Sequence, residues 1–114
     1  MTGNEMSQVK NMLIFAERID RDMKGVSRID FEENDTLQDS TLYRLGQLGE
    51  TAGNLSEDFK ESNPAVPWRQ MADMRNRLFH FYDAINMDIV FEVAAQQIPA
   101  IIAELKQIIS TEGR

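Results

Sequence analysis

The chain contains no cysteine, few prolines and no long apolar run, and each of these absences excludes a class of protein. None of its 114 residues is cysteine, which excludes disulfides, thiolate metal sites and cysteine nucleophiles. No apolar run reaches the roughly 20 residues of a membrane-spanning helix, and the start MTGNEMSQVK lacks the apolar core of a secretion signal. We therefore expect one cytoplasmic domain over residues 1–114.

Basic residues are scarce in the chain as a whole but not everywhere. Lysine and arginine number 12 against 19 aspartates and glutamates, so the net charge is −7. This balance argues against a protein that coats nucleic acid, because polyanion binding needs clustered cations. Between residues 69 and 80, however, Arg69, Arg75 and Arg77 stand against only Asp73. That local excess favours a small anion-handling site over an extended binding face.

Apolar residues recur three and four positions apart through nearly the whole chain, and no convincing run alternates with a period of two. This pattern predicts an all-α fold, an antiparallel helical bundle of four to five helices. The helices are expected over about residues 4–24, 35–60, 67–83 and 86–110.

Several residues set the expected helix boundaries. Gly25 is a plausible stop for the first helix, and the acidic segment after it is expected to be irregular, with a short turn at RIDF. Pro67 suits the first position of the third helix, and Asn86 or Asp88 can cap the fourth. Pro99 should kink or split that last helix.

The second expected helix contains three glycines, Gly46, Gly49 and Gly53. Each glycine inside a helix costs about 1 kcal/mol relative to alanine, so three of them need a compensating interaction. Close approach of another helix backbone is the compensation we expect. Glu50, which follows the second glycine, could serve a functional site or a contact between two chains.

The stretch RNRLFHFY, residues 75–82, holds the only histidine of the chain, His80. Histidine suits proton transfer near neutral pH, and the planar fork of Arg75 suits a phosphate group. Acid and base roles generally need two groups, which two chains related by a two-fold axis would supply. At about 100° per residue, Arg75 and His80 lie about 140° apart around the helix, so both would meet only in a cleft between two helices.

Structural roles for the same residues stay open. A lone helical histidine such as His80 is often a hydrogen-bonded structural residue, and Arg75 alone would usually be a surface or ion-pair arginine. Arg77 could be a solvated or RNA-facing charge, and Tyr82 could pack its ring at a helix end. Trp68 is expected in the core or in an interface.

The chain resembles the HEPN domains, and in particular the HepT-like toxins. RNRLFHFY fits their Arg-x4-His motif in the form RN-x-L-x-H-x-Y. LGQLGETAGNLSEDF, PAVPWRQMADMRNRLFH and MDIVFEVAAQQIPAIIAEL resemble the flanking helices of the family. The resemblance covers nearly the whole chain from about Met6, although the family commonly has alanine where this chain has Thr51.

The resemblance implies a homodimeric, metal-independent ribonuclease toxin without a cofactor. It implies that Arg75 and His80 form the catalytic pair, with Asn76 and Arg77 as supporting residues. The partner would be an MntA-like nucleotidyltransferase antitoxin, which attaches AMP to Tyr82 and so places a bulky anion beside the arginines. A non-catalytic helical module that dimerises and docks the same partner is the alternative.

Overall fold

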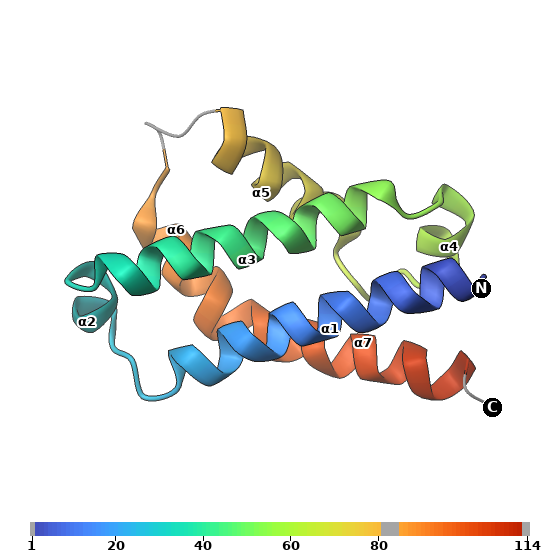
Figure 1. Cartoon of the computed structure of the whole chain (residues 1–114), viewed down its shortest axis with the longest axis horizontal. Coiled ribbons are helices and arrows are strands. Elements are labelled where there is room, and N and C mark those ends of the chain that lie inside the picture. Colours follow the sequence, from blue (N-terminus) through green and yellow to red (C-terminus); the bar gives the residue numbers. More distant parts are fainter. Residues whose placement is uncertain (1, 81–84, 113–114) are drawn as a thin grey trace.

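A computed structural model of the chain describes residues 2–80 and 85–112 (Figure 1). Over these residues all regular structure is helical, with no strand, which confirms the predicted all-α class. Among the same residues, no helix has the length and hydropathy that crossing a lipid bilayer requires.

The first helix, α1 (Gly3–Met23), begins and ends within one residue of its predicted bounds. Thr2 caps its start, because Thr2 Oγ1 accepts a hydrogen bond from the Glu5 N–H and Glu5 Oε1 accepts one from the Thr2 N–H, both at 3.0 Å. Gly25 confirms the predicted stop with a φ of +71°, in the left-handed region that glycine adopts without steric cost. The buried stripe of this helix faces the core: Val9, Met12, Ala16, Ile19 and Met23.

A short helix, α2 (Arg28–Glu32), occupies the acidic segment at the predicted RIDF turn. Ser27 and Asp30 form a second reciprocal cap at its start. Phe31 is fully buried, and its ring centroid lies 5.7 Å from that of Phe91. An aromatic anchor therefore holds this segment on the bundle.

The prediction of one helix over residues 35–60 is wrong, because the chain breaks it into α3 (Asp35–Asn54) and α4 (Glu57–Ser62). Leu55 is extended, and the Ser56 hydroxyl accepts a hydrogen bond from the Phe59 N–H at 3.1 Å, which starts a new helix. Leu55 and Phe59 are nevertheless both buried, so the break leaves these predicted apolar positions in the core.

The helix α5 (Trp68–His80) starts one residue later than predicted, with Pro67 immediately before it. The Pro67 carbonyl accepts the first hydrogen bond of the helix, so the missing N–H of the proline costs nothing there. Trp68 is buried against Phe59, with ring centroids 5.7 Å apart, and its indole N–H donates to a backbone carbonyl at 2.9 Å. The predicted core position of this tryptophan is confirmed.

Three helical pieces form the last part of the chain: α6 (Met87–Glu92), the π-helical turn η2 (Val93–Gln97) and α7 (Ile98–Glu112). Asn86 caps α6, because its side chain accepts from two backbone N–H groups of the first turn. The predicted cap is therefore confirmed.

The π-helical turn confirms that Pro99 interrupts the last helix. Proline has no N–H to donate, and its ring would clash with the carbonyl of Ala95 in a regular α-helix. The chain avoids this clash by widening one turn, so that the Ile98 N–H donates to the Val93 carbonyl, five residues earlier.

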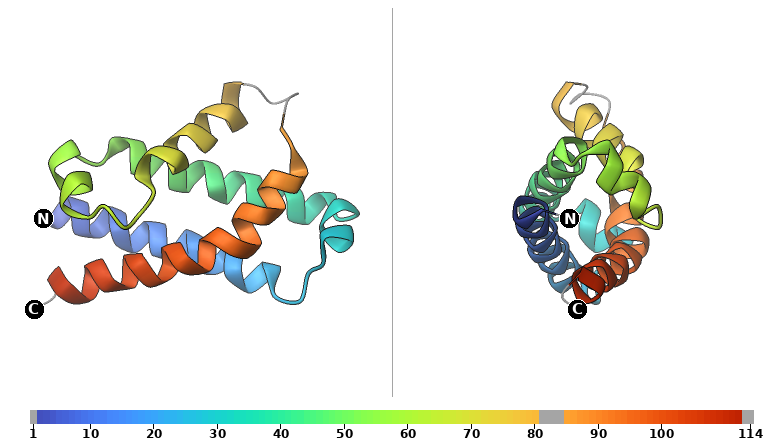
Figure 2. Two further views of the ribbon diagram at one scale, coloured as in Figure 1. Left: turned by 180° about the vertical axis from the view of Figure 1, so that it is seen from behind. Right: turned by 90° about the vertical axis from the view of Figure 1, so that its right-hand side faces the viewer.

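The long helices run side by side in alternating directions (Figures 1 and 2). α3 packs against both α1 and α5, and α1 packs against α7. α5 leans away from the rest of the bundle toward its C-terminal end, as both views show. In the antiparallel bundle α1 thus packs between α3 and α7, whereas α5 is held mainly by α3.

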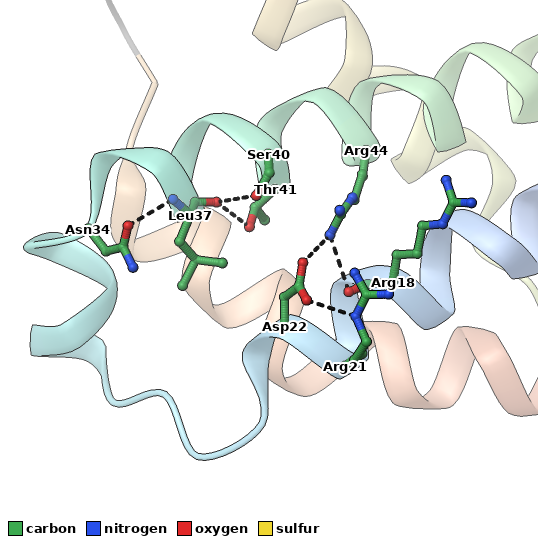
Figure 3. A network of polar contacts seen from close by, with 8 residues as sticks. All are labelled: Arg18, Arg21, Asp22, Asn34, Leu37, Ser40, Thr41 and Arg44. Atoms are coloured by element: carbon green, nitrogen blue, oxygen red, sulfur yellow. Dashed lines mark hydrogen bonds and ion pairs between the residues drawn. The ribbon is translucent and has the colours of Figure 1, made fainter.

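A polar network joins the end of α1 to α3 (Figure 3). The Asp22 carboxylate accepts from Arg21 Nε at 2.9 Å and also pairs with Arg44 Nη1, which donates as well to the Arg18 carbonyl at 3.2 Å. Hydrogen bonds from Arg21 and then Arg44 lower the pKa of Asp22 to about 2.

Candidate active site

The predicted site residues lie on the C-terminal half of α5. Arg75 is partly buried, Asn76 and Arg77 are exposed, and His80 is the last residue of the helix. The His80 side chain and the whole of Tyr82 lie outside the described residues, as does the predicted helix end near residue 83. The roles of the imidazole and the phenol therefore stay predictions.

At Gly49 the backbone of α3 approaches α5 very closely. A Cβ on Gly49 would lie 2.3 Å from the Met71 carbonyl oxygen and 2.4 Å from the Arg75 Cβ, distances that no side chain can occupy. On Gly53 a Cβ would meet only the Ala72 Cβ, at an ordinary 3.7 Å. The predicted close approach of a second helix is confirmed at Gly49, and it falls beside the motif arginine.

Glu50, the residue after this contact, forms an ion pair with Arg75. Glu50 Oε2 lies 2.7 Å from Arg75 Nε, while Arg75 Nη1 donates to Asn76 Oδ1 at 3.1 Å. On the far side of the pair, Asn54 Nδ2 donates to Glu50 Oε1 at 3.4 Å. The sequence did not predict which residue this glutamate contacts. The feature that could have indicated it is the adjacent Gly49, which lies on the helix that packs against the motif helix.

The arrangement fixes one guanidinium from two directions. The ion-pair reading of Arg75 is thus observed, and it is compatible with binding a phosphate, because arginine carries five N–H donors in a planar fork. The Arg75 side chain is 29% exposed, so solvent or a ligand reaches part of it. Chemically, the group supplies a fixed positive charge with a defined orientation.

Two apolar cavities lie beside α5, whose main packing partner is α3. One has a volume of about 330 Å³ and the other about 210 Å³, and Met74 and Ile89 line both. Leu78 and Val90 add to the first cavity, and Arg77 lies at it as well. The helix that carries the motif therefore borders two apolar cavities.

No group of three or more histidine, aspartate or glutamate residues that could hold a metal ion occurs among the described residues. Among the described residues near Arg75, Glu50 contributes one carboxylate, and Asn54 and Asn76 contribute two amides. They suit hydrogen bonding to a guanidinium more than coordination of a cation.

Comparison with known proteins assigns the chain to a family. The model of the family described as "Ribonuclease HepT-like" matches residues 9–108, a range that holds Gly49, Glu50, Arg75 and His80. The chain belongs to the HepT-like ribonuclease family. The resemblance noted at the motif is thereby confirmed for most of the chain.

Relatives of this HepT-like chain include proteins that are named as ribonucleases. "Putative RNase TTE0752" of Caldanaerobacter subterraneus subsp. tengcongensis is 33% identical over 79% of this chain and 80% of its own length. "Probable ribonuclease HepT" of Thermococcus cleftensis is 32% identical over 63% of this chain and 66% of its own length.

A longer relative shows the same domain as part of a larger protein. "Gamma-glutamylcyclotransferase and putative RNase MJ0434" of Methanocaldococcus jannaschii is 29% identical over 88% of this chain, but the match spans only 45% of that protein. No solved structure matches the HepT-like chain.

Proposed function

We propose that this HepT-like chain is a metal-independent endoribonuclease, the toxin of a prokaryotic toxin–antitoxin pair of the type VII kind. The observation that carries the proposal is the fixed guanidinium of Arg75, five residues before the only histidine, on the motif helix of a ribonuclease family. A fixed arginine suits the phosphate of RNA, and a histidine suits proton transfer near neutral pH.

Arg75 and His80 would divide the chemistry between them. The 2′-oxygen of a ribose attacks the adjacent phosphorus and loses its proton to a base, and the 5′-oxygen leaves and takes up a proton from an acid. His80 supplies such proton transfers, and Arg75 offsets the negative charge that builds on the phosphate oxygens. Asn76 orients Arg75, and the exposed Arg77 draws in the RNA backbone. The products are a 2′,3′-cyclic phosphate and a 5′-hydroxyl.

The active form would be a homodimer with a composite site in the cleft between two copies of α5. One chain has a single histidine, while the acid and the base are two roles. Two observations support burial of this face by a second copy. An apolar cavity lies beside α5, and the Ile89 side chain that lines it is 44% exposed.

Control by an MntA-like nucleotidyltransferase rests on the family resemblance. Transfer of AMP to the Tyr82 hydroxyl, with release of pyrophosphate from ATP, would place a new phosphate two residues from His80. That anion would compete with RNA for the same arginines.

The test is cleavage of RNA by the purified chain in the presence of EDTA. Wild-type protein, with unmodified Tyr82 confirmed by intact mass, should cut RNA and leave 2′,3′-cyclic phosphate ends. Arg75→Ala and His80→Ala should each abolish the cutting, and His80→Ala should relieve growth arrest on expression. Intact RNA with the unmodified wild-type dimer would favour a non-catalytic module that docks the nucleotidyltransferase.

A further inference from the structure

We infer that Glu50 is the positioning residue for Arg75 in RNA cleavage, an inference that rests on the proposed function. Glu50 would not touch the RNA. It would hold the guanidinium in the one orientation in which the arginine meets the scissile phosphate.

The first argument is the geometry of the pair. Glu50 Oε2 lies 2.7 Å from Arg75 Nε, a separation typical of a charge-assisted contact, and the two residues belong to different helices. An arginine side chain has high rotamer freedom, and its contact to the adjacent Asn76 comes from its own helix. The second contact, from α3, removes much of that freedom.

The second argument is the backbone that carries Glu50. At the preceding residue, Gly49, α3 is pressed against Met71 and the Cβ of Arg75 itself. The base of the arginine and the base of the glutamate are therefore fixed by the same helix contact. Supports on rigid helices hold a functional group more accurately than supports on loops.

The third argument is electrostatic. The Glu50 side chain is 46% exposed, so solvent screens the pair and its contribution to folding is small. A pair with little value for stability but a defined geometry is better explained by its effect on Arg75. The carboxylate also offsets part of the arginine charge, which tempers RNA binding while the orientation is kept.

The experiment measures single-turnover cleavage of a labelled, mixed-sequence RNA by the full chain. Glu50→Gln and Glu50→Ala should lower the cleavage rate about 10- to 100-fold, the loss expected when a reacting group is slightly misplaced. The RNA concentration at half-maximal rate should stay unchanged or fall. Glu17→Gln is the matched control, because it removes an α1 carboxylate that lies 3.9 Å from Lys106 on α7, and it should cleave like wild type.

Guanidinium rescue distinguishes positioning from a general loss of folded protein. Added guanidinium at millimolar concentration should restore part of the activity of Arg75→Ala, because Glu50 and Asn76 still hold the cation. The same addition should fail to restore Arg75→Ala combined with Glu50→Ala, with the folded fraction checked by circular dichroism.

Three outcomes separate this inference from the proposed function. If wild type cleaves RNA, Arg75→Ala does not, and both Glu50 variants cleave like wild type, the inference alone is overturned. Equal rescue of the single and the double variant overturns it as well. If wild-type protein does not cleave RNA, the proposed function fails and this inference fails with it.

Discussion

A Cβ placed on Gly49 would stand 2.4 Å from the Cβ of Arg75, so the two residues cannot both carry a side chain at the present helix separation. The candidate catalytic arginine therefore lies at a close contact between α3 and α5. The packing of α3 on α5 and the candidate chemistry of Arg75 can therefore be tested at the same position.

Gly49→Ala should destabilise the chain by about 1–3 kcal/mol, because the new methyl group forces the two helices apart. Gly53→Ala is the matched control one turn along α3, where a Cβ has an ordinary contact. It should be neutral or stabilising by up to about 1 kcal/mol, since alanine is the better helix former. Urea unfolding followed by circular dichroism measures both, and equal stabilities would contradict the close approach.

The Asp22 network should make a contribution to stability that disappears in acid. The pKa of Asp22 is lowered to about 2 in the folded chain. The contribution to stability is therefore complete above the pKa of an unfolded aspartate, about 3.9, and is lost as the pH falls through about 2. The difference in unfolding free energy between wild type and Asp22→Asn should therefore be constant near neutral pH and shrink between about pH 4 and pH 2. Glu61→Gln, at an exposed position on α4, serves as the control for general carboxylate effects. A difference that is flat across that range would contradict the network.

Ser56→Ala should lower the stability of the chain by about 1 kcal/mol, because the Phe59 N–H loses its capping acceptor. The same hydroxyl donates to Glu5 Oε2 at 2.9 Å, so the cap also links α4 to the start of α1. Thermal unfolding measures the loss, and Ser62→Ala, at the exposed end of α4, provides a comparison. An equal or larger loss at Ser62 would show that the cap is not what separates the two helices.

Ile89→Glu should weaken the proposed dimer about tenfold or more, since it replaces an apolar side chain that a second copy would bury with a charge. Ile29→Glu on α2 is the control, because Ile29 is 65% exposed and lies on a different helix. Sedimentation velocity over a concentration series gives both dissociation constants. RNA cleavage by Ile89→Glu should fall in parallel, and wild-type protein that stays monomeric at micromolar concentration would contradict the composite site.

Local signals predicted the parts of the fold that local physics decides. The apolar stripe of α1, the left-handed Gly25 and the cap at Asn86 all depend on residues within one or two turns. The glycine pattern also predicted an interhelical contact, although only the structure shows that the neighbour of Gly49 is Arg75.

The break at Ser56 was not predictable from periodicity. Leu55 and Phe59 continue the three-and-four spacing of α3, and the same spacing arises whether the chain runs on or turns back. The chain can start a new helix at the Ser56 cap because Leu55 and Phe59 are still buried after the break. Pairs such as Asp22–Arg44 and Glu50–Arg75 join positions more than twenty residues apart, and no spacing rule encodes them.

The wide turn before Pro99 lets this part of the chain hold one residue more than a regular α-helix would over the same turns. Val90, Ala94 and Ile98 are buried four residues apart, and at about 100° per residue the line they form would drift by about 80° over eight residues of a regular helix. The π-helical turn absorbs that drift, so α6 and α7 present one continuous apolar edge to the core. Deleting a single residue between Val93 and Gln97 would remove the extra residue of the wide turn, and the regular α-helix that results would bring the Pro99 ring against the carbonyl four residues before it.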